Sequence, residues 1–219
     1  MNERRFSLMS TKEASVTNIN FHFDPLCPLA WRTALWARET RQIRPLHITW
    51  RLFSLEIVNR KPDAQPDYVN GNGWAALRTL ALARRLHGNE SIEKLYIELG
   101  NAAHGRKEDI RTRAVVEAAA EAAGLGKDFV EQALTDDSTI QDVIQDHEEA
   151  VNRYHAFGVP TIALEDSNVG YYGPVIHSVP KGEDAAALWD HFIWFLHNDN
   201  IYELKRDRAG APPFGPVSA

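Results

Sequence analysis

Residues 21–31 read FHFDPLCPLAW, and this stretch decides the fold that the sequence predicts. Apolar and polar residues alternate over residues 17–23, which is the pattern of a β-strand. Pro28 suits the first position of a helix, and apolar residues then recur at helical spacing over residues 28–40. Cys27 therefore stands at the junction between a strand and a helix.

A cysteine at this junction points its sulfur at unpaired backbone N–H groups and at the positive end of the helix dipole. Both favour the thiolate, which is the nucleophilic form, so we expect a lowered pKa at Cys27. The alternative is that Cys27 is a small buried apolar residue, the common state of a single cysteine. The stretch by itself leaves both interpretations open.

Downstream of the junction, the pattern changes from strand to helix and back again. Further strands are predicted over residues 46–55, 161–164 and 169–172, with a last helix over about 183–197. Between them a series of helices is predicted near residues 74–81, 92–99, 110–122, 129–133 and 140–151. Two early strands joined by a helix indicate a parallel pair, and two late strands joined by a tight turn indicate a hairpin. The predicted fold class is α/β, a thioredoxin-like mixed sheet with a helical insertion.

This order divides the chain into predicted parts. They are a flexible leader (1–16), a thioredoxin-like core (17–61 and 156–200), a helical insertion (62–155) and a C-terminal tail (201–219). A cleft where a core meets an insertion is a common ligand site. We therefore expect the site between the start of the Cys27 helix and the insertion, with Leu29 and Trp74 among its apolar lining.

A second candidate element is the turn at residues 157–161, which leads directly into a predicted strand. In thioredoxin folds a proline at this place is cis and lies beside the reactive sulfur, so we expect a cis Val159–Pro160 bond against Cys27. Val159, Pro160 and Thr161 would then contact the substrate. An ordinary trans loop proline is the alternative.

Composition excludes several classes of function. The chain has 219 residues and a formal net charge of -6, without the concentrated positive charge that nucleic acid binding needs. No apolar segment near the N-terminus indicates a signal peptide or a membrane span, and Cys27 is the single cysteine, so a cytoplasmic location without a disulfide is expected. The histidines show no metal-ligand spacing near Cys27, and no metal is expected.

At this point the chain resembles a known family, the DsbA-like mycothiol-dependent nitroreductases of actinobacteria. The similarity covers residues 19–214 and rests on 21–31, 54–59, Gly100-Asn101 with His104, 158–161, 171–175, 180–183, 188–190, 203–206 and Pro212-Pro213. The resemblance implies a cytoplasmic oxidoreductase that uses a low-molecular-weight thiol to reduce substrates, including nitro compounds, under a helical lid.

The family motif Cys-Pro-Trp-Cys reads Cys27-Pro28-Leu29-Ala30 here, so dithiol exchange within the chain is excluded. The resemblance implies that Cys27 is catalytic and that Pro28, Leu29 and Ala30 contact substrate. Asn59 and His104 match positions that face the pocket in this family. Asn59 would bond a thiol cofactor, and His104 would act as a base or a hydrogen-bond donor; a loop-capping Asn and a His satisfied at a helix end are the alternatives.

The predicted function is a monothiol oxidoreductase that acts through Cys27. Its co-substrate is a low-molecular-weight thiol of the mycothiol or glutathione type, and its substrate a small electrophile or disulfide. A glutathione-transferase or isomerase activity of the kappa type is one alternative, and a redox-inactive binding protein is another. No nucleic acid or membrane partner is expected, and the protein would be a monomer or a homodimer.

Overall fold

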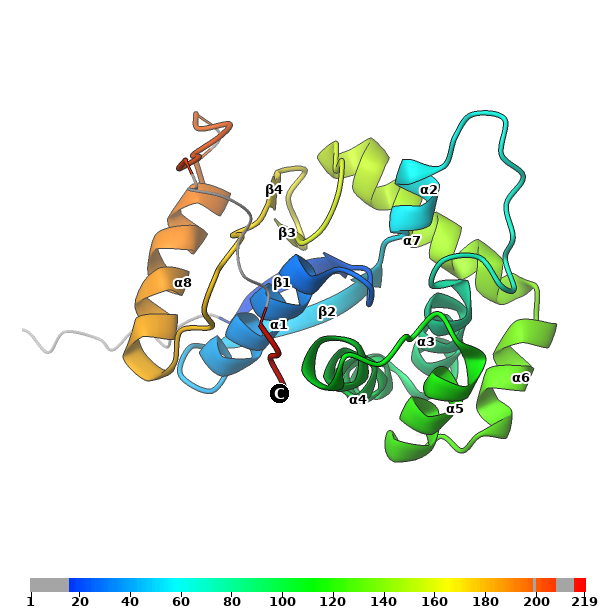
Figure 1. Cartoon of the computed structure of the whole chain (residues 1–219). Helices are drawn as coiled ribbons and strands as arrows, with labels where there is room; N and C mark the ends of the chain where they lie inside the picture. Colours follow the sequence, from blue (N-terminus) through cyan, green and yellow to red (C-terminus); the bar gives the residue numbers. More distant parts are fainter. Residues whose placement is uncertain (1–15, 199, 208–214) are drawn as a thin grey trace, which may run out of the picture.

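The computed structural model describes residues 16–198, 200–207 and 215–219 (Figure 1). The predicted leader therefore lies outside the described residues except for Val16. Among the described helices, none combines the length and the apolar character that crossing a membrane requires.

A four-stranded mixed sheet forms the centre of the fold, in the order β2-β1-β3-β4. The strands are β1 (Thr17–Phe23), β2 (Leu46–Leu52), β3 (Thr161–Leu164) and β4 (Gly170–Tyr172). β1 pairs with β2 in parallel, while β3 runs antiparallel to both β1 and β4. The predicted parallel pair and the predicted hairpin are both confirmed, and with them the thioredoxin-like fold class.

Helices lie between the strands and after the last strand. They are α1 (Pro28–Thr40), α2 (Leu55–Asn59), α3 (Trp74–His87), α4 (Asn89–Gly100), the π-helix η1 (Asn101–Arg106), α5 (Arg113–Ala122), α6 (Asp128–Thr135), α7 (Ser138–Tyr154) and α8 (Gly182–Leu196). In Figure 1, α3 to α6 gather on one side of the sheet and α8 lies on the other side. The chain between β2 and β3 is thus mostly helical, as the change of periodicity predicts.

An aromatic cluster joins the insertion to the core. Tyr96 of α4 stacks on Phe23 of β1 at 3.8 Å between ring centroids, and meets Trp31 of α1 and Trp50 of β2 edge-on at 5.5 and 5.6 Å. All four rings are buried. Buried aromatic pairs add to the hydrophobic gain of the area that they cover. The insertion therefore packs firmly on the strand-helix junction that carries Cys27.

Two predicted boundaries are wrong. The predicted strand over residues 46–55 ends at Leu52, because the Ser54 hydroxyl accepts the N–H of Ile57 at 3.2 Å and caps the short helix α2. The helix predicted from residue 110 begins at Arg113, because Thr112 folds back on the Asp109 carbonyl through both its N–H and its hydroxyl. Both errors come from local hydrogen bonds that side-chain periodicity does not report.

Candidate active site

Cys27 is the N-cap of α1, and Pro28 occupies the first helical turn. The chain takes this form because proline has the dihedral angle of a helix start and lacks an N–H that would need a partner there. The Ala30 N–H donates to the Cys27 sulfur at 3.4 Å. The side chain is only 6% exposed. Cys27 is therefore held at the helix start, as predicted, but below the surface.

The expected lowering of the Cys27 pKa is wrong. Burial raises the pKa of the Cys27 thiol from 9.0 to about 11, and the N–H groups of Ala30 and Leu29 offset only part of this rise. The nearby Asp24 carboxylate adds to the rise by repelling a thiolate. A thiolate taken out of water loses more solvation than the helix start returns. The resting form of Cys27 is thus the neutral thiol.

The loop before β3 brings a second segment to the sulfur. The Val159–Pro160 peptide bond is cis, the form expected from the sequence. The Cys27 S–H donates to the Val159 carbonyl at 3.4 Å, across 132 positions of sequence. Thr161 is buried, and its hydroxyl donates to the Gly158 carbonyl at 2.8 Å. This bond holds the loop in shape beside the sulfur.

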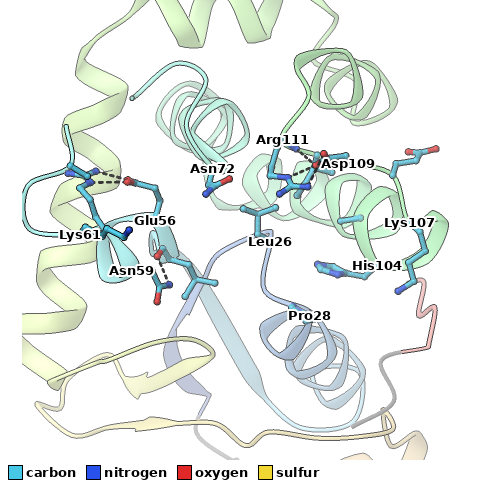
Figure 2. Close-up of a pocket in the computed structure, with 16 residues that line it drawn as sticks. Leu26, Pro28, Glu56, Asn59, Lys61, Asn72, His104, Lys107, Asp109 and Arg111 are labelled. Carbon is cyan, nitrogen blue, oxygen red and sulfur yellow. Dashed lines mark hydrogen bonds and ion pairs between the residues drawn. The ribbon is translucent and has the colours of Figure 1, made fainter. Parts of the chain in front are cut away.

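A cleft of about 780 Å³ opens next to the start of α1, between the core and the insertion. Figure 2 shows Leu26 and Pro28 at its floor, Asn59 on one wall and His104 on the other. The lining residues are Leu26, Pro28, Leu55, Glu56, Asn59, Arg60, Lys61, Ala64, Asn72, Ala103, His104, Lys107, Glu108, Asp109, Ile110 and Arg111. A cleft of this volume is large enough for a small-molecule ligand.

His104 is a polar residue of this cleft that the surrounding structure holds in place. It is largely buried on η1, its ring stacks on Trp31 at 6.0 Å, and its Nε2 bonds the Pro25 carbonyl at 2.9 Å. A carbonyl only accepts, so Nε2 carries the proton, and burial lowers the pKa of His104. The neutral ring therefore keeps Nδ1 as a hydrogen-bond acceptor.

Asn59 lines the opposite wall from the end of α2 and is exposed. Its amide donates to the Leu55 carbonyl at 2.7 Å within its own short helix. The side-chain nitrogen of Asn59 is thus held by a bond within α2.

Other predicted residues lie outside the cleft lining. Leu29 packs against the hydrophobic core, and Ala30 is fully buried. Trp74 was expected in the lining but is fully buried, and its indole N–H donates to Glu56 at 2.9 Å. The expectation that Leu29 and Trp74 line the cleft is wrong: the half-buried Leu29 packs against the core, Trp74 is fully buried, and neither is among the lining residues.

The lining also contains charged residues that the sequence patterns do not predict. Arg60 pairs with Glu56, and Arg111 pairs with Asp109, so part of this charge is internally balanced. The run from Arg106 to Arg111 is almost entirely charged. This run of charges is the sequence signal that indicates the charged wall of the cleft on the insertion side. Within the described part of the chain, no group of three or more His, Cys, Asp or Glu residues is placed to hold a metal ion.

Solved structures show how widely this fold is shared. The chain superposes on a probable DsbA oxidoreductase, SCO1869, from Streptomyces coelicolor (TM-score 0.55, 18% identity, 93% of this chain and 99% of that chain). It also superposes on the cytosolic disulfide reductase DsbM from Pseudomonas aeruginosa with GSH (0.57, 15%, 81% and 99%). A third match is a 2-hydroxychromene-2-carboxylate isomerase (0.57, 18%, 84% and 97%). At these identities the likeness shows a DsbA-like thioredoxin fold.

Sequence comparison is more specific. The chain is 32% identical over 200 residues to the uncharacterized protein Rv2286c of Mycobacterium tuberculosis, which covers 90% of this chain and 84% of that protein. The sequence profile of the Rv2466c-like family, described as mycothiol-dependent nitroreductase Rv2466c, matches residues 26–206. The matched region holds Cys27, the cis-proline loop and both walls of the cleft. The chain belongs to the Rv2466c-like family of mycothiol-dependent nitroreductases.

Proposed function

We propose that this protein is a thiol-dependent oxidoreductase that acts through Cys27 alone, with a low-molecular-weight thiol of the mycothiol type as co-substrate. The observation that carries the proposal is the placement of Cys27. Its sulfur lies at the start of α1, bonded to the Ala30 N–H and to the Val159 carbonyl, and the residues on either side of Cys27, Leu26 and Pro28, line a cleft of about 780 Å³. Family membership supports the choice of thiol.

The chemistry requires an external thiol, because Cys27 is the single cysteine of the 219 residues. Cys27, which rests as the neutral thiol, loses its proton as its sulfur attacks a substrate disulfide; the S–S bond breaks, and the half that leaves as a thiolate takes up a proton. A first co-substrate thiolate then attacks the Cys27 sulfur and releases the other half of the substrate. A second co-substrate thiolate regenerates Cys27 and forms the co-substrate disulfide. Two thiols are oxidised and one disulfide is reduced.

The cleft would hold the body of the co-substrate. Its floor of Leu26 and Pro28 lies next to Cys27, and its walls carry polar groups on both sides. The neutral His104 ring offers Nδ1 to accept a thiol S–H, and Asn59 offers its side-chain oxygen. Val159, Pro160 and Thr161 would face the substrate on the other side of the sulfur. The substrate would be a small disulfide or electrophile.

A second candidate function is supported by the neutral state of Cys27. With its pKa raised to about 11, the thiol is a hydrogen-bond donor at physiological pH. It would donate to the thiolate of a bound co-substrate instead of attacking a disulfide itself. This is the role expected in a kappa-type glutathione transferase or isomerase. A redox-inactive binding protein would use the same cleft without either chemistry.

We further propose a cytoplasmic location, because a single thiol resolved by a small thiol requires a reducing compartment. The partners would then be small molecules, with the chain acting as a monomer or a homodimer.

Intact mass measurement tests these functions. Oxidised mycothiol, with oxidised glutathione in parallel, should add one thiol mass to the native chain, reversed by excess reduced thiol. The matched control, Cys27→Ser, should add nothing. If the native chain gains no mass, the oxidoreductase proposal fails. Titration calorimetry with reduced mycothiol then separates the two alternative functions. Binding that is weakened by Cys27→Ala but kept in Cys27→Ser indicates the transferase type, and binding that neither substitution changes indicates a binding protein.

A further inference from the structure

The last residues of the chain, 215–219, return to the strand-helix junction although the sequence indicates only a tail. The Trp31 indole N–H donates to the Val217 carbonyl at 2.8 Å, and an Arg32 guanidinium N–H donates to the Gly215 carbonyl at 3.1 Å. Figure 1 shows the C-terminus beside α1. We call residues 215–219 the C-terminal strap.

The same strap also bonds the π-helix η1 in the insertion. The Val217 N–H donates to the His104 carbonyl at 3.0 Å, and the Ala219 N–H donates to the Asn101 side chain at 2.8 Å. The last carbonyls of a helix have no donor within the helix, and a buried carbonyl without a donor is costly. The strap supplies that donor at His104.

Gly105 provides independent evidence that the strap binds at a specific position on η1. A Cβ atom at this position would lie 2.3 Å from the Ser218 hydroxyl oxygen and 3.4 Å from the Ser218 Cβ. A Cβ atom there would force the Ser218 hydroxyl to rotate away, and a longer side chain would also meet the Ser218 Cβ. Gly105 is therefore complementary in shape to the strap.

The two residues that Val217 bonds also touch each other. The His104 ring stacks on Trp31. The Nε2 atom of His104 donates to the carbonyl of Pro25, two residues before Cys27. We infer that the C-terminal strap is a positioning element that holds His104 and η1 in the wall of the cleft. Its effect on co-substrate binding rests on the function proposed above, whereas its effect on His104 does not.

A compensating pair of substitutions tests this inference in the full-length protein. Gly105→Val should displace the strap, because the γ carbons of valine extend beyond the Cβ position into the space of the Ser218 Cβ. Gly105→Val/Ser218→Gly should let the strap return, because the second change removes the Ser218 side chain. Ser218→Gly alone is the matched control and should behave as the native chain. A chain that ends at Phe214 should reproduce the Gly105→Val effect without any change in η1.

Two readouts are needed. In isotope-labelled protein the His104 ring resonances should shift in Gly105→Val and in the truncated chain, and return in the double variant. The affinity for reduced mycothiol should fall about tenfold in the first two and recover in the double variant, a factor typical of coupling between contacting groups. Folded Gly105→Val protein with native His104 resonances, or a double variant without recovery, would overturn the inference. If the resonances respond as expected but the native chain binds no thiol, the strap stands and the proposed function fails.

Discussion

Cys27 should react slowly with alkylating agents at neutral pH, and removing the charge of Asp24 should speed the reaction. Asp24 is fully buried three residues before Cys27. Its carboxylate accepts the N–H of Leu26 at 2.8 Å and of Leu55 at 2.7 Å, which ties the Cys27 turn to α2. Burial raises the pKa of Asp24 to about 6, so this carboxylate is charged above that pH.

The magnitude follows from the pKa of the thiol. With the pKa raised by burial from 9.0 to about 11, the thiolate fraction at pH 8 falls about 100-fold, or ~2.7 kcal/mol against ionisation. Asp24→Asn removes the repulsion and keeps one amide oxygen as an acceptor. The midpoint of Cys27 should then move down, yet stay above that of an exposed thiol, because burial is the larger cause.

The assay is the initial rate of iodoacetamide addition to native and Asp24→Asn protein between pH 7 and pH 11, followed by intact mass. Asp190→Asn, on α8 and paired with Arg44, removes an equal charge at a distance and should leave the midpoint unchanged. A native midpoint below the ~8.5 of an unperturbed thiol would refute the reasoning that burial outweighs the helix start. An unchanged midpoint in Asp24→Asn would refute the role given to Asp24.

Four further outcomes are expected. Burial lowers the pKa of His22 to about 3, so the contribution of the neutral ring to stability is complete above pH 6.5 and is lost as the pH falls towards 3. In urea unfolding, His22→Phe should therefore remove roughly 4 kcal/mol of the stability difference between pH 7 and pH 3.5. Tyr96→Phe should raise stability by about 1 kcal/mol in the same assay, since its buried hydroxyl has no hydrogen-bond partner among the described residues. Ala30→Cys should form an internal disulfide, seen as a loss of two mass units, and should suppress the stable thiol adduct. Measured by calorimetry, His104→Ala should weaken the binding of reduced mycothiol more than Asn59→Ala, because the His104 side chain is buried in the cleft wall and the Asn59 side chain is exposed. Equal affinities of the native protein and both variants would remove both residues from the site.

The features that the sequence predicts correctly are those set by neighbouring residues. The alternation over Thr17–Phe23 and the proline after Cys27 specify a strand followed at once by a helix, because both depend on local dihedral preferences. The order of these strands and helices along the chain then predicts a thioredoxin-like sheet. The loss of the second motif cysteine is likewise visible without a structure, and it decides that any disulfide exchange needs an external thiol.

The features that the tertiary structure alone decides depend on water and on distant parts of the chain. The helix start at Cys27 predicts a thiolate, but the packing of the cis-proline loop and of α1 removes the solvent that a thiolate needs. Whether His104 faces solvent or a cleft wall depends on η1 and on Val217, which lies more than a hundred residues further along the chain. Local sequence patterns report neither such desolvation nor such long-range bonds. For this reason the sequence singles out Cys27 as the candidate residue, while the fold determines its protonation state and its surroundings.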